Sequence, residues 1–296
     1  MIREPWYKLF RTVGDACWDV GRRVEAMDET GIAIQVLSPM PELLSYWFAP
    51  ADALFLGRAV NDAIGGMVQG APGRFIGLGM VPMQEPELAA RELETLMRDT
   101  RFHGIEIGTN VNGVSIADPR FAPVFAAAEE TGAAVFVHAL HPAGDTHLIG
   151  PTALKAVAAF PCETALTIAA LMTSGTLSRF PRLKIAFSHG GGAFGLVLPR
   201  LMQGWTVLPS MREAIAESPA DIARRLYYDS LVYDAATLAF LVGTFGERQI
   251  MIGTDYPFDI FERDPIRRLR DTALPEATLD LLEDGNARRF LGLTEP

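Results

Sequence analysis

Residues 184–192, KIAFSHGGG, decide how the rest of this sequence is interpreted. The apolar run 185–187 is typical of a short buried strand, and Ser188, His189 and three glycines mark its end. Because glycine has no side chain, a ligand can approach the backbone closely just after this strand. The stretch therefore predicts a histidine at the carboxyl end of a buried strand.

Two further apolar runs end in side chains that bind metals or transfer protons. Residues 134–138, AVFVH, end in His138. Residues 250–255, IMIGTD, end in Asp255. Each residue alone is equally consistent with a structural histidine or a capping aspartate. In a parallel α/β barrel, however, the carboxyl ends of all strands converge, so His138, His189 and Asp255 are expected to meet.

Imidazole and carboxylate ligands together suit zinc or another first-row divalent ion. If His189 instead acts as an acid or base, only His138 and Asp255 remain as ligands, and a zinc site normally has at least three.

Seven apolar runs alternate with helical patterns, which predicts an α/β fold with a parallel sheet. One closed (β/α)8 barrel would use nearly all of the 296 residues, but it needs eight strands. The sequence is therefore interpreted as an α/β TIM-barrel in which seven of the eight strands are recognised, and residues 1–296 are expected to form one domain. The predicted strands are 32–37, 75–80, 104–108, 134–138, 184–189, 226–230 and 250–255.

The segment between His138 and His189 is predicted to be helical over residues 152–180, in two pieces interrupted at Pro161. The other predicted helices are 19–28, 52–70, 86–99, 118–130, 193–203, 219–225, 235–243, 265–270 and 275–291.

Composition narrows the class of protein. Hydrophobic residues make up 49% and charged residues 21%, as in ordinary globular proteins. The net charge of −10 argues against nucleic acid or an anionic membrane as partner, since both need a basic surface. Two cysteines, Cys17 and Cys162, are too few for a disulfide framework. No apolar span of 18 residues and no signal segment is recognised, so a cytoplasmic protein is expected.

Several other side chains are candidates for contact with a small-molecule substrate. Arg11, Arg200 and the pair Tyr46 and Trp47 qualify, because arginine holds a carboxylate with two parallel hydrogen bonds. Most arginines are nevertheless solvated surface residues. There is no GxGxxG, P-loop or GxSxG motif, which disfavours phosphate-loop and serine-hydrolase chemistry.

The remaining histidines are interpreted as structural or solvated. His141 and His147 lie in a loop rich in proline and glycine, where solvated histidines are expected in preference to ligands. His103 precedes a strand, and so belongs to the opposite rim of a barrel.

At SHGGGAF and GTDYPF the sequence resembles the metal-dependent amidohydrolase superfamily. It is similar to the branch that contains aminocarboxymuconate-semialdehyde decarboxylase and related non-oxidative aromatic-acid decarboxylases. The resemblance covers nearly the whole chain. Its motifs are CWDVGRRVEAMDETGIAIQVLSPMP at 17–41, SYW at 45–47, RFIGLGMVPMQEPELA at 74–89, FVH at 136–138, RFPRLKIAFSHGGGAF at 179–194 and IMIGTDYPF at 250–258.

The resemblance implies a (β/α)8 TIM-barrel, metal-dependent hydrolase-like, that lacks its first strand and is therefore N-terminally incomplete. It also implies a divalent metal, most often Zn²⁺. It implies that His138 and Asp255 are metal ligands and that His189 is the catalytic acid or base. Arg11, in FRTV, matches a substrate-binding arginine. Arg200 matches an arginine that reaches the neighbouring subunit's site, which implies a homodimer.

Two departures from the family pattern concern the site. The family's first strand carries a His-x-His pair of metal ligands, and this sequence has neither the strand nor the pair. A His-Pro-Trp-Asp run of the decarboxylase is replaced here by residues 138–142, HALHP.

The expected function is therefore non-oxidative decarboxylation of an unsaturated or aromatic carboxylic acid. The alternatives are a metal-dependent hydrolase or hydratase of a lactone, amide or unsaturated diacid, and an inactive paralogue.

Overall fold

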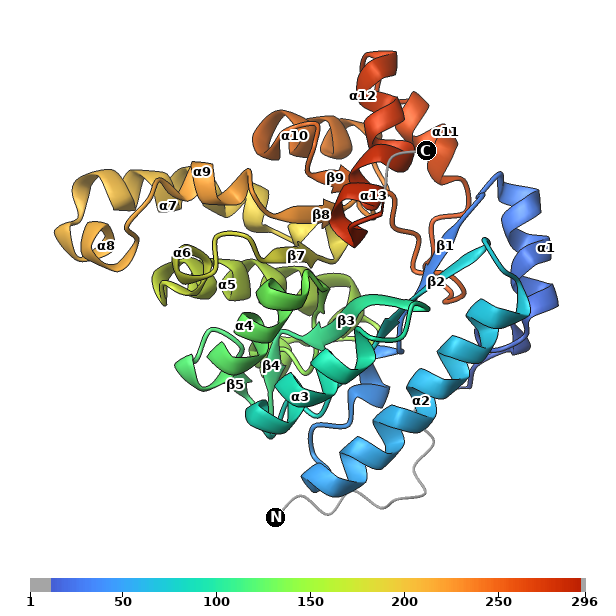
Figure 1. Ribbon diagram of the computed structural model, residues 1–296. Helices are drawn as coiled ribbons and strands as arrows, with labels where there is room; N and C mark the ends of the chain where they lie inside the picture. Colours follow the sequence, from blue (N-terminus) through green and yellow to red (C-terminus); the bar gives the residue numbers. More distant parts are fainter. Residues whose placement is uncertain (1–11, 294–296) are drawn as a thin grey trace.

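The computed structural model describes residues 12–293, and its centre is a seven-stranded parallel sheet that curls into an open barrel (Figure 1). The seven strands predicted from the apolar runs are confirmed. The strand order β1-β2-β3-β6-β7-β8-β9 leaves β1 and β9 as the two edges. The strands are β1 (Gln35–Leu37), β2 (Phe75–Gly79), β3 (Phe102–Gly108), β6 (Ala134–His138), β7 (Lys184–Phe187), β8 (Tyr227–Asp229) and β9 (Ile250–Met251).

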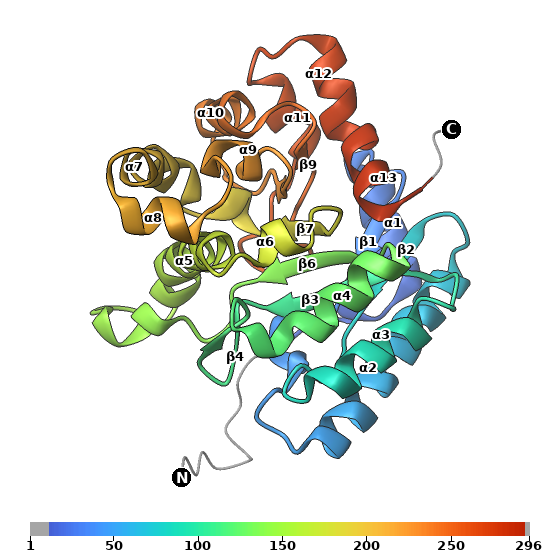
Figure 2. The ribbon, with the colours of Figure 1, turned by 60° about the vertical axis from the view of Figure 1, so that its left-hand side comes forward.

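Helices cover the convex side of this sheet, as Figures 1 and 2 show for α2 to α5. The longer helices are α1 (Val20–Thr30), α2 (Pro50–Gly70), α3 (Pro86–Leu96), α4 (Ala122–Thr131), α5 (Phe160–Thr173), α7 (Phe194–Val207) and α10 (Ala235–Phe245). The shorter ones are α6 (Thr176–Arg179), α8 (Pro209–Ala214), α9 (Pro219–Ala223), α11 (Pro265–Arg270), α12 (Glu276–Asp280) and α13 (Asn286–Leu291).

Side chains alternate between the two faces of each strand, and β6 shows what each face carries. Val135 and Val137 are fully buried against the helices, on what we call the outer face. Ala134, Phe136 and His138 point to the concave side, the inner face. Parallel register aligns Ala134 with Gly104 and Lys184 on the neighbouring strands, so the inner faces of adjacent strands form continuous rows.

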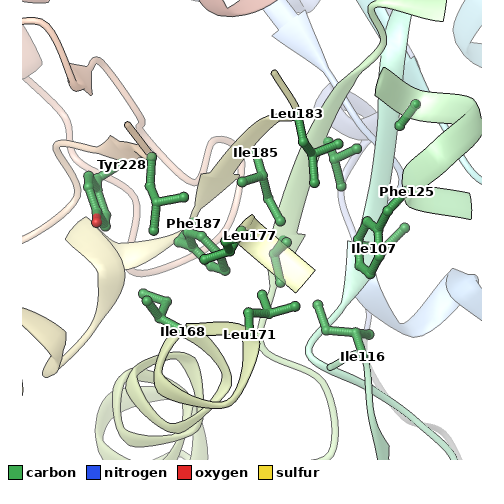
Figure 3. Packing of buried hydrophobic residues seen from close by; sticks show 14 of the residues in the cluster. Ile107, Ile116, Phe125, Ile168, Leu171, Leu177, Leu183, Ile185, Phe187 and Tyr228 are labelled. Carbon is green, nitrogen blue, oxygen red and sulfur yellow. The ribbon is translucent and has the colours of Figure 1, made fainter. Parts of the chain in front are cut away.

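The main hydrophobic core lies between the outer face and the helices. Figure 3 shows Ile168 and Leu171 of α5 packed toward Ile185 and Phe187 of β7, all four with no exposed surface. Burying such side chains contributes about 1.5–3 kcal/mol each, so this layer supplies much of the stability that holds the strand ends in place.

The predicted break within the helical segment 152–180 is placed at the wrong residue. Pro161 does not interrupt a helix: it lies in the first turn of α5, and a π-helical turn, Lys155–Ala159, runs directly into it. The π-helical turn accommodates the proline, which has no N–H to donate and whose ring would clash with the carbonyl of residue i−4 in a regular α-helix. The break comes instead at Gly175, which adopts φ 74° before α6.

The segment Lys155–Thr173 also corrects the expectation that no 18-residue span is strongly apolar. Its mean hydropathy of 1.5 and its 19 residues would suffice to cross a membrane by length and composition alone. In this fold one side of the segment packs on the sheet, and it includes the buried, hydrogen-bonded Glu163. Core helices of globular proteins have this composition when they are buried on one side.

Arg23 of α1 lies between the two edges of the sheet. Its Nη1 donates to Gln35 Oε1 of β1 at 2.8 Å, and its guanidinium lies 5.3 Å from the ring centre of Tyr256, which follows β9. This side chain thereby connects the segments that border the open side of the barrel.

Candidate active site

The structure brings His138 and His189 together at the carboxyl ends of β6 and β7. Their ring centres are 5.0 Å apart and the rings are nearly perpendicular, at 73°. Phe160, at the start of α5, contacts both rings, with centre distances of 5.7 Å to His138 and 6.4 Å to His189. Two of the three predicted strand-end side chains are thus in one cluster, against an apolar wall.

The tautomer of His138 follows from its hydrogen bond. Its Nδ1 lies 2.8 Å from the carbonyl oxygen of Ala139, which can only accept, so Nδ1 carries the proton. Burial and the neighbouring His189 lower the pKa of His138 to about 4. At neutral pH the ring is therefore neutral, and the lone pair on Nε2 is available to a metal ion.

His189 is also a neutral imidazole at pH 7, because burial lowers its pKa to about 4. Its Nδ1 lies 3.2 Å from Ser188 Oγ. The residue adopts φ 57°, in the left-handed region, at the start of the glycine turn.

Asp255 follows β9 in a turn and also has a left-handed backbone, with φ 59°. Its charge acts on two neighbours that belong to the same end of the barrel. It contributes, after burial, to raising the pKa of Tyr233 to about 12 and that of Glu106 to about 8. Asp255 therefore lies within electrostatic range of the inner face, as its place after the last strand predicted.

Glu106 is a site residue that the sequence analysis missed. It lies on β3 in register with Phe136, which places it on the inner face one step below His138. Only 2% of it is exposed, and no residue in the described part of the chain hydrogen-bonds to its Oε1. Burial raises its pKa to about 8, helped by Asp255 and opposed by a hydrogen bond with Ser38.

Asp229, at the end of β8, is a second residue missed in the sequence. It is 5% exposed and accepts three backbone hydrogen bonds, from His189 (3.0 Å), Gly190 (2.8 Å) and Leu231 (3.0 Å). Burial raises its pKa, and these N–H groups oppose that shift. A carboxylate inside an apolar run, as in YYDS and GIEIG, is the signal that could have identified both residues.

The predicted substrate contacts are distributed differently. Trp47 is half exposed, and its ring lies 5.5 Å from that of His141, tilted by 32°. Arg200 is exposed on α7, away from the strand ends, and Arg11 lies outside the described residues. His103 lies at the other end of β3, where its Nδ1–H donates to the carbonyl oxygen of Leu291 at 3.1 Å, in keeping with a structural role.

The loop after His138 is tied to the helix layer. Glu163 Oε2 accepts from the backbone N–H of Ala143 at 3.1 Å, and Lys155 pairs with Asp145 at 2.9 Å. His141 and His147 both remain exposed in this loop, as predicted. His141, which packs against Trp47, consequently lies on an anchored loop.

The donor types at the site fit a divalent metal, and their number falls short of a complete set. A neutral imidazole and a carboxylate are suitable ligands for such an ion. Among residues 12–293, however, no three His, Cys, Asp or Glu side chains are arranged to hold a metal ion.

Comparison with known proteins identifies the family. The family model described as amidohydrolase matches residues 5–293. The 2-amino-3-carboxymuconate-6-semialdehyde decarboxylase of Dictyostelium discoideum is 37% identical over 288 residues, which cover 97% of this chain and 80% of that protein.

Solved structures agree in fold. The crystal structure of 5-carboxyvanillate decarboxylase from Sphingomonas paucimobilis superposes with a TM-score of 0.85 at 29% identity, covering 93% of this chain and 84% of that one. A dihydroxybenzoic acid decarboxylase from Polaromonas sp., with bound manganese and the inhibitor 2-nitroresorcinol, gives a TM-score of 0.81 at 26% identity, over 93% and 86%. The chain therefore belongs to the amidohydrolase family, in the branch that includes aminocarboxymuconate-semialdehyde decarboxylase.

Proposed function

We propose that this chain catalyses the metal-dependent, non-oxidative decarboxylation of a small unsaturated or aromatic carboxylic acid. The observation that carries the proposal is the pair of neutral imidazoles, 5.0 Å apart, at the ends of two adjacent strands in a chain 37% identical to a decarboxylase. Such a pair can divide the work, since one imidazole can bind a metal while the other moves a proton.

His138 and Asp255 would hold the ion, His138 through Nε2. When bound, the ion supplies Lewis-acid polarisation of substrate oxygens and fixes the orientation of the substrate. We propose Zn²⁺ as the resident metal, because imidazole and carboxylate ligands suit it. Manganese in the Polaromonas enzyme makes Mn²⁺ the competing choice, to be decided by metal analysis.

The remaining ligands would come from residues outside 12–293. Zinc sites normally have at least three protein ligands, and residues 12–293 contain no group of three His, Cys, Asp or Glu side chains that could hold an ion. We propose that a strand carrying a His-x-His pair belongs beside β1, at the open side of the barrel.

His189 would move the proton that replaces the carboxylate. When the substrate's C–C bond breaks, CO2 leaves, the electron pair stays on the ring or chain carbon, and that carbon takes a proton. Because burial lowers the pKa of His189 to about 4, its imidazolium form, once made by accepting a proton from water or a substrate hydroxyl, gives that proton up readily.

Arg11, Trp47 and Arg200 are the proposed substrate contacts. Arginine would hold a carboxylate group, and Trp47 would supply an aromatic surface beside the site. Arg200 is exposed on α7, as an arginine that reaches the site of a neighbouring copy would be, and we propose a homodimer, located in the cytoplasm. Light scattering that shows only monomer at micromolar concentration would contradict the dimer.

The test compares the 296-residue chain with a version extended upstream by an in-frame strand that contains His-x-His. Both are given carboxymuconate and hydroxybenzoate substrates, with CO2 release and bound metal measured. We expect CO2 release that EDTA abolishes and Zn²⁺ or Mn²⁺ restores, with the extended chain more active and more fully loaded. Ring opening or hydration without CO2 would favour a hydrolase or hydratase. Full metal loading and equal turnover in the short chain would show that the proposed extra ligands are dispensable.

A further inference from the structure

The turn that carries His189 has an uncommon backbone. His189, Gly190, Gly191 and Gly192 have φ values of 57°, 62°, 75° and 61°, four successive residues in the left-handed region. For a residue with a side chain, this conformation costs free energy, of order 1–3 kcal/mol, and persists only where surrounding contacts impose it. Some group must therefore hold His189 in this conformation.

The left-handed backbone changes the direction of the His189 side chain. On β7, Ile185 and Phe187 lie on the outer face, so a continued strand would point residue 189 outward as well. Instead the His189 ring contacts that of His138, which lies on the inner face. The turn therefore redirects this imidazole from the helix side of the sheet to the site.

Asp229 is the group that holds the turn. One carboxylate oxygen accepts from the N–H of His189, and the other accepts from the N–H groups of Gly190 and Leu231. Both oxygens are thus occupied by backbone donors, and the side chain is nearly fully buried. Two of these bonds fix the peptide groups on either side of the His189 α-carbon, and the third fixes Asp229's own strand end.

The neighbouring strand leaves room for this arrangement. Gly253 follows β9, and a Cβ atom there would lie 2.6 Å from the Cβ atom of Asp229. Real Cβ atoms do not approach so closely, so any larger residue at 253 would displace the carboxylate. Gly253 and Asp229 therefore form one structural unit that lies behind the glycine turn.

We propose that Asp229 is a positioning residue for His189, which holds the backbone of the turn so that the imidazole faces the site. The proposal deepens the proposed function and rests on it only for the role of His189 as acid or base. Asp229 itself touches no substrate, because both of its oxygens are used by backbone N–H groups.

The test is Asp229→Asn, with Asp234→Asn as matched control. Asparagine keeps the size of aspartate but replaces one acceptor oxygen by an NH2 group, which would face a backbone N–H. Asp234 also accepts a backbone N–H, from Thr237 at 2.7 Å, but it caps α10 on the exposed surface. We expect kcat to fall roughly 10- to 100-fold in Asp229→Asn, because small misplacements of a reacting group cost this much.

Two further readouts separate positioning from general destabilisation. KM and bound metal should stay within about twofold of wild type in Asp229→Asn, since a positioning change acts on the transition state and not on ground-state binding. Amide hydrogen exchange of His189 and Gly190 should be faster than in wild type and in Asp234→Asn. A kcat of Asp229→Asn equal to that of wild type would overturn the proposal. So would a fall in kcat accompanied by a comparable change in KM and a comparable loss of bound metal.

If Asp229→Asn does not fold, Gly253→Ala provides the same test, because it displaces the carboxylate and keeps its charge. A soluble Gly253→Ala protein with wild-type kcat and unchanged exchange at His189 would also overturn the proposal. Amide hydrogen exchange is measured without substrate, so it tests the role of Asp229 separately from the proposed decarboxylase activity. If wild type decarboxylates nothing, the proposed function fails alone, and Asp229 is still judged by whether its replacement frees the two amides.

Discussion

The outer and inner faces of the same sheet differ in what their side chains do. Along β6, Val135 and Val137 on the outer face are completely buried among helix side chains. Phe136 and His138, one residue away in each case, lie on the inner face and are partly accessible. The outer face is almost purely apolar, whereas titratable groups are concentrated on the inner face.

Strand periodicity therefore separates the residues that stabilise the fold from those that can take part in chemistry. A period of two assigns every second residue to each face, so one strand can contribute to the core and to the site at once. The inner face accepts costs that the outer face avoids: a carboxyl with an unpartnered oxygen at Glu106, and left-handed residues at His189 and Asp255. Strained and destabilising groups of this kind are found where function requires them.

The largest expected effect comes from the inner face. His189→Asn should lower kcat by about 10²–10⁴-fold, the contribution typical of a general acid or base. CO2 release under saturating substrate measures it. His103→Asn is the control, because His103 lies at the opposite end of its strand and bonds only to a backbone carbonyl. Equal losses of kcat in the two variants would contradict a specific role for His189, because the effect would then be one of folding.

Truncating a buried residue of the core at the outer face should lower the stability of the fold and leave catalysis unchanged. Leu171→Ala, in the core between α5 and the sheet, should lower the free energy of unfolding by about 2–5 kcal/mol. Leu196→Ala is the matched control, because Leu196 is 76% exposed and its loss should cost less than about 0.5 kcal/mol. Urea titration measures both. If kcat of folded Leu171→Ala at low temperature departed by more than about tenfold from wild type, the faces would be coupled.

Glu106→Gln should change how the stability of the protein depends on pH. The folded carboxyl has a pKa of about 8, above the ordinary value of 4.5, so it keeps its proton where the unfolded chain has released it. Its contribution to stability is therefore present at low pH and is lost as pH rises from about 5 to 8. Glutamine does not titrate, so metal-free Glu106→Gln should exceed wild type in melting temperature at pH 8 by several degrees, and by less at pH 5.

Glu163→Gln is the control for that pH effect. Glu163 is also buried, but its oxygens accept from Ala143 and lie near the Asn110 amide, so its replacement should not stabilise the protein. A stability gain for Glu106→Gln that is equal at pH 5 and pH 8 would show that the carboxyl is ionised in both conditions.

The smallest effect is expected at the loop above the inner face. Trp47→Ala removes the ring that packs on His141, a contact worth about 0.5–1.5 kcal/mol. KM should rise a few-fold while kcat stays close to wild type, and steady-state kinetics measure this. Trp18→Ala, at another exposed tryptophan, should change neither value. A loss in kcat alone would place Trp47 with the catalytic groups and not with the substrate contacts.

The strands could be predicted from sequence because each is a mainly apolar run with turn residues after it. The same runs placed His138 and His189 at strand ends, and the 5.0 Å ring separation confirms that they converge. Strand ends were predicted too long, as at 184–189 and 250–255, since apolar runs continue into turns that no longer pair. The assigned roles of these residues stay predictions.

Other features needed the tertiary structure. Asp229 acts through backbone bonds to a turn 40 residues away, and no local pattern encodes that pairing. Glu106 sits inside the predicted strand 104–108, and the sequence analysis assigned it no role. The hairpin β4 (Asn110–Val111) and β5 (Val114–Ser115) was missed although Asn112 and Gly113, with φ 52° and 82°, form the turn that an Asn-Gly pair favours.

The contact between the rings of Trp47 and His141 offers a fluorescence signal for ligand binding. Indole fluorescence is quenched by a neighbouring imidazolium, and it changes when a ligand displaces either ring. Trp47 lies on one side of this contact and the loop after β6 on the other, so its emission reports on the distance between two separate segments. A titration of fluorescence in a variant whose other tryptophans, Trp6, Trp18 and Trp205, are replaced by phenylalanine would therefore follow ligand entry without any need for turnover or for a labelled substrate.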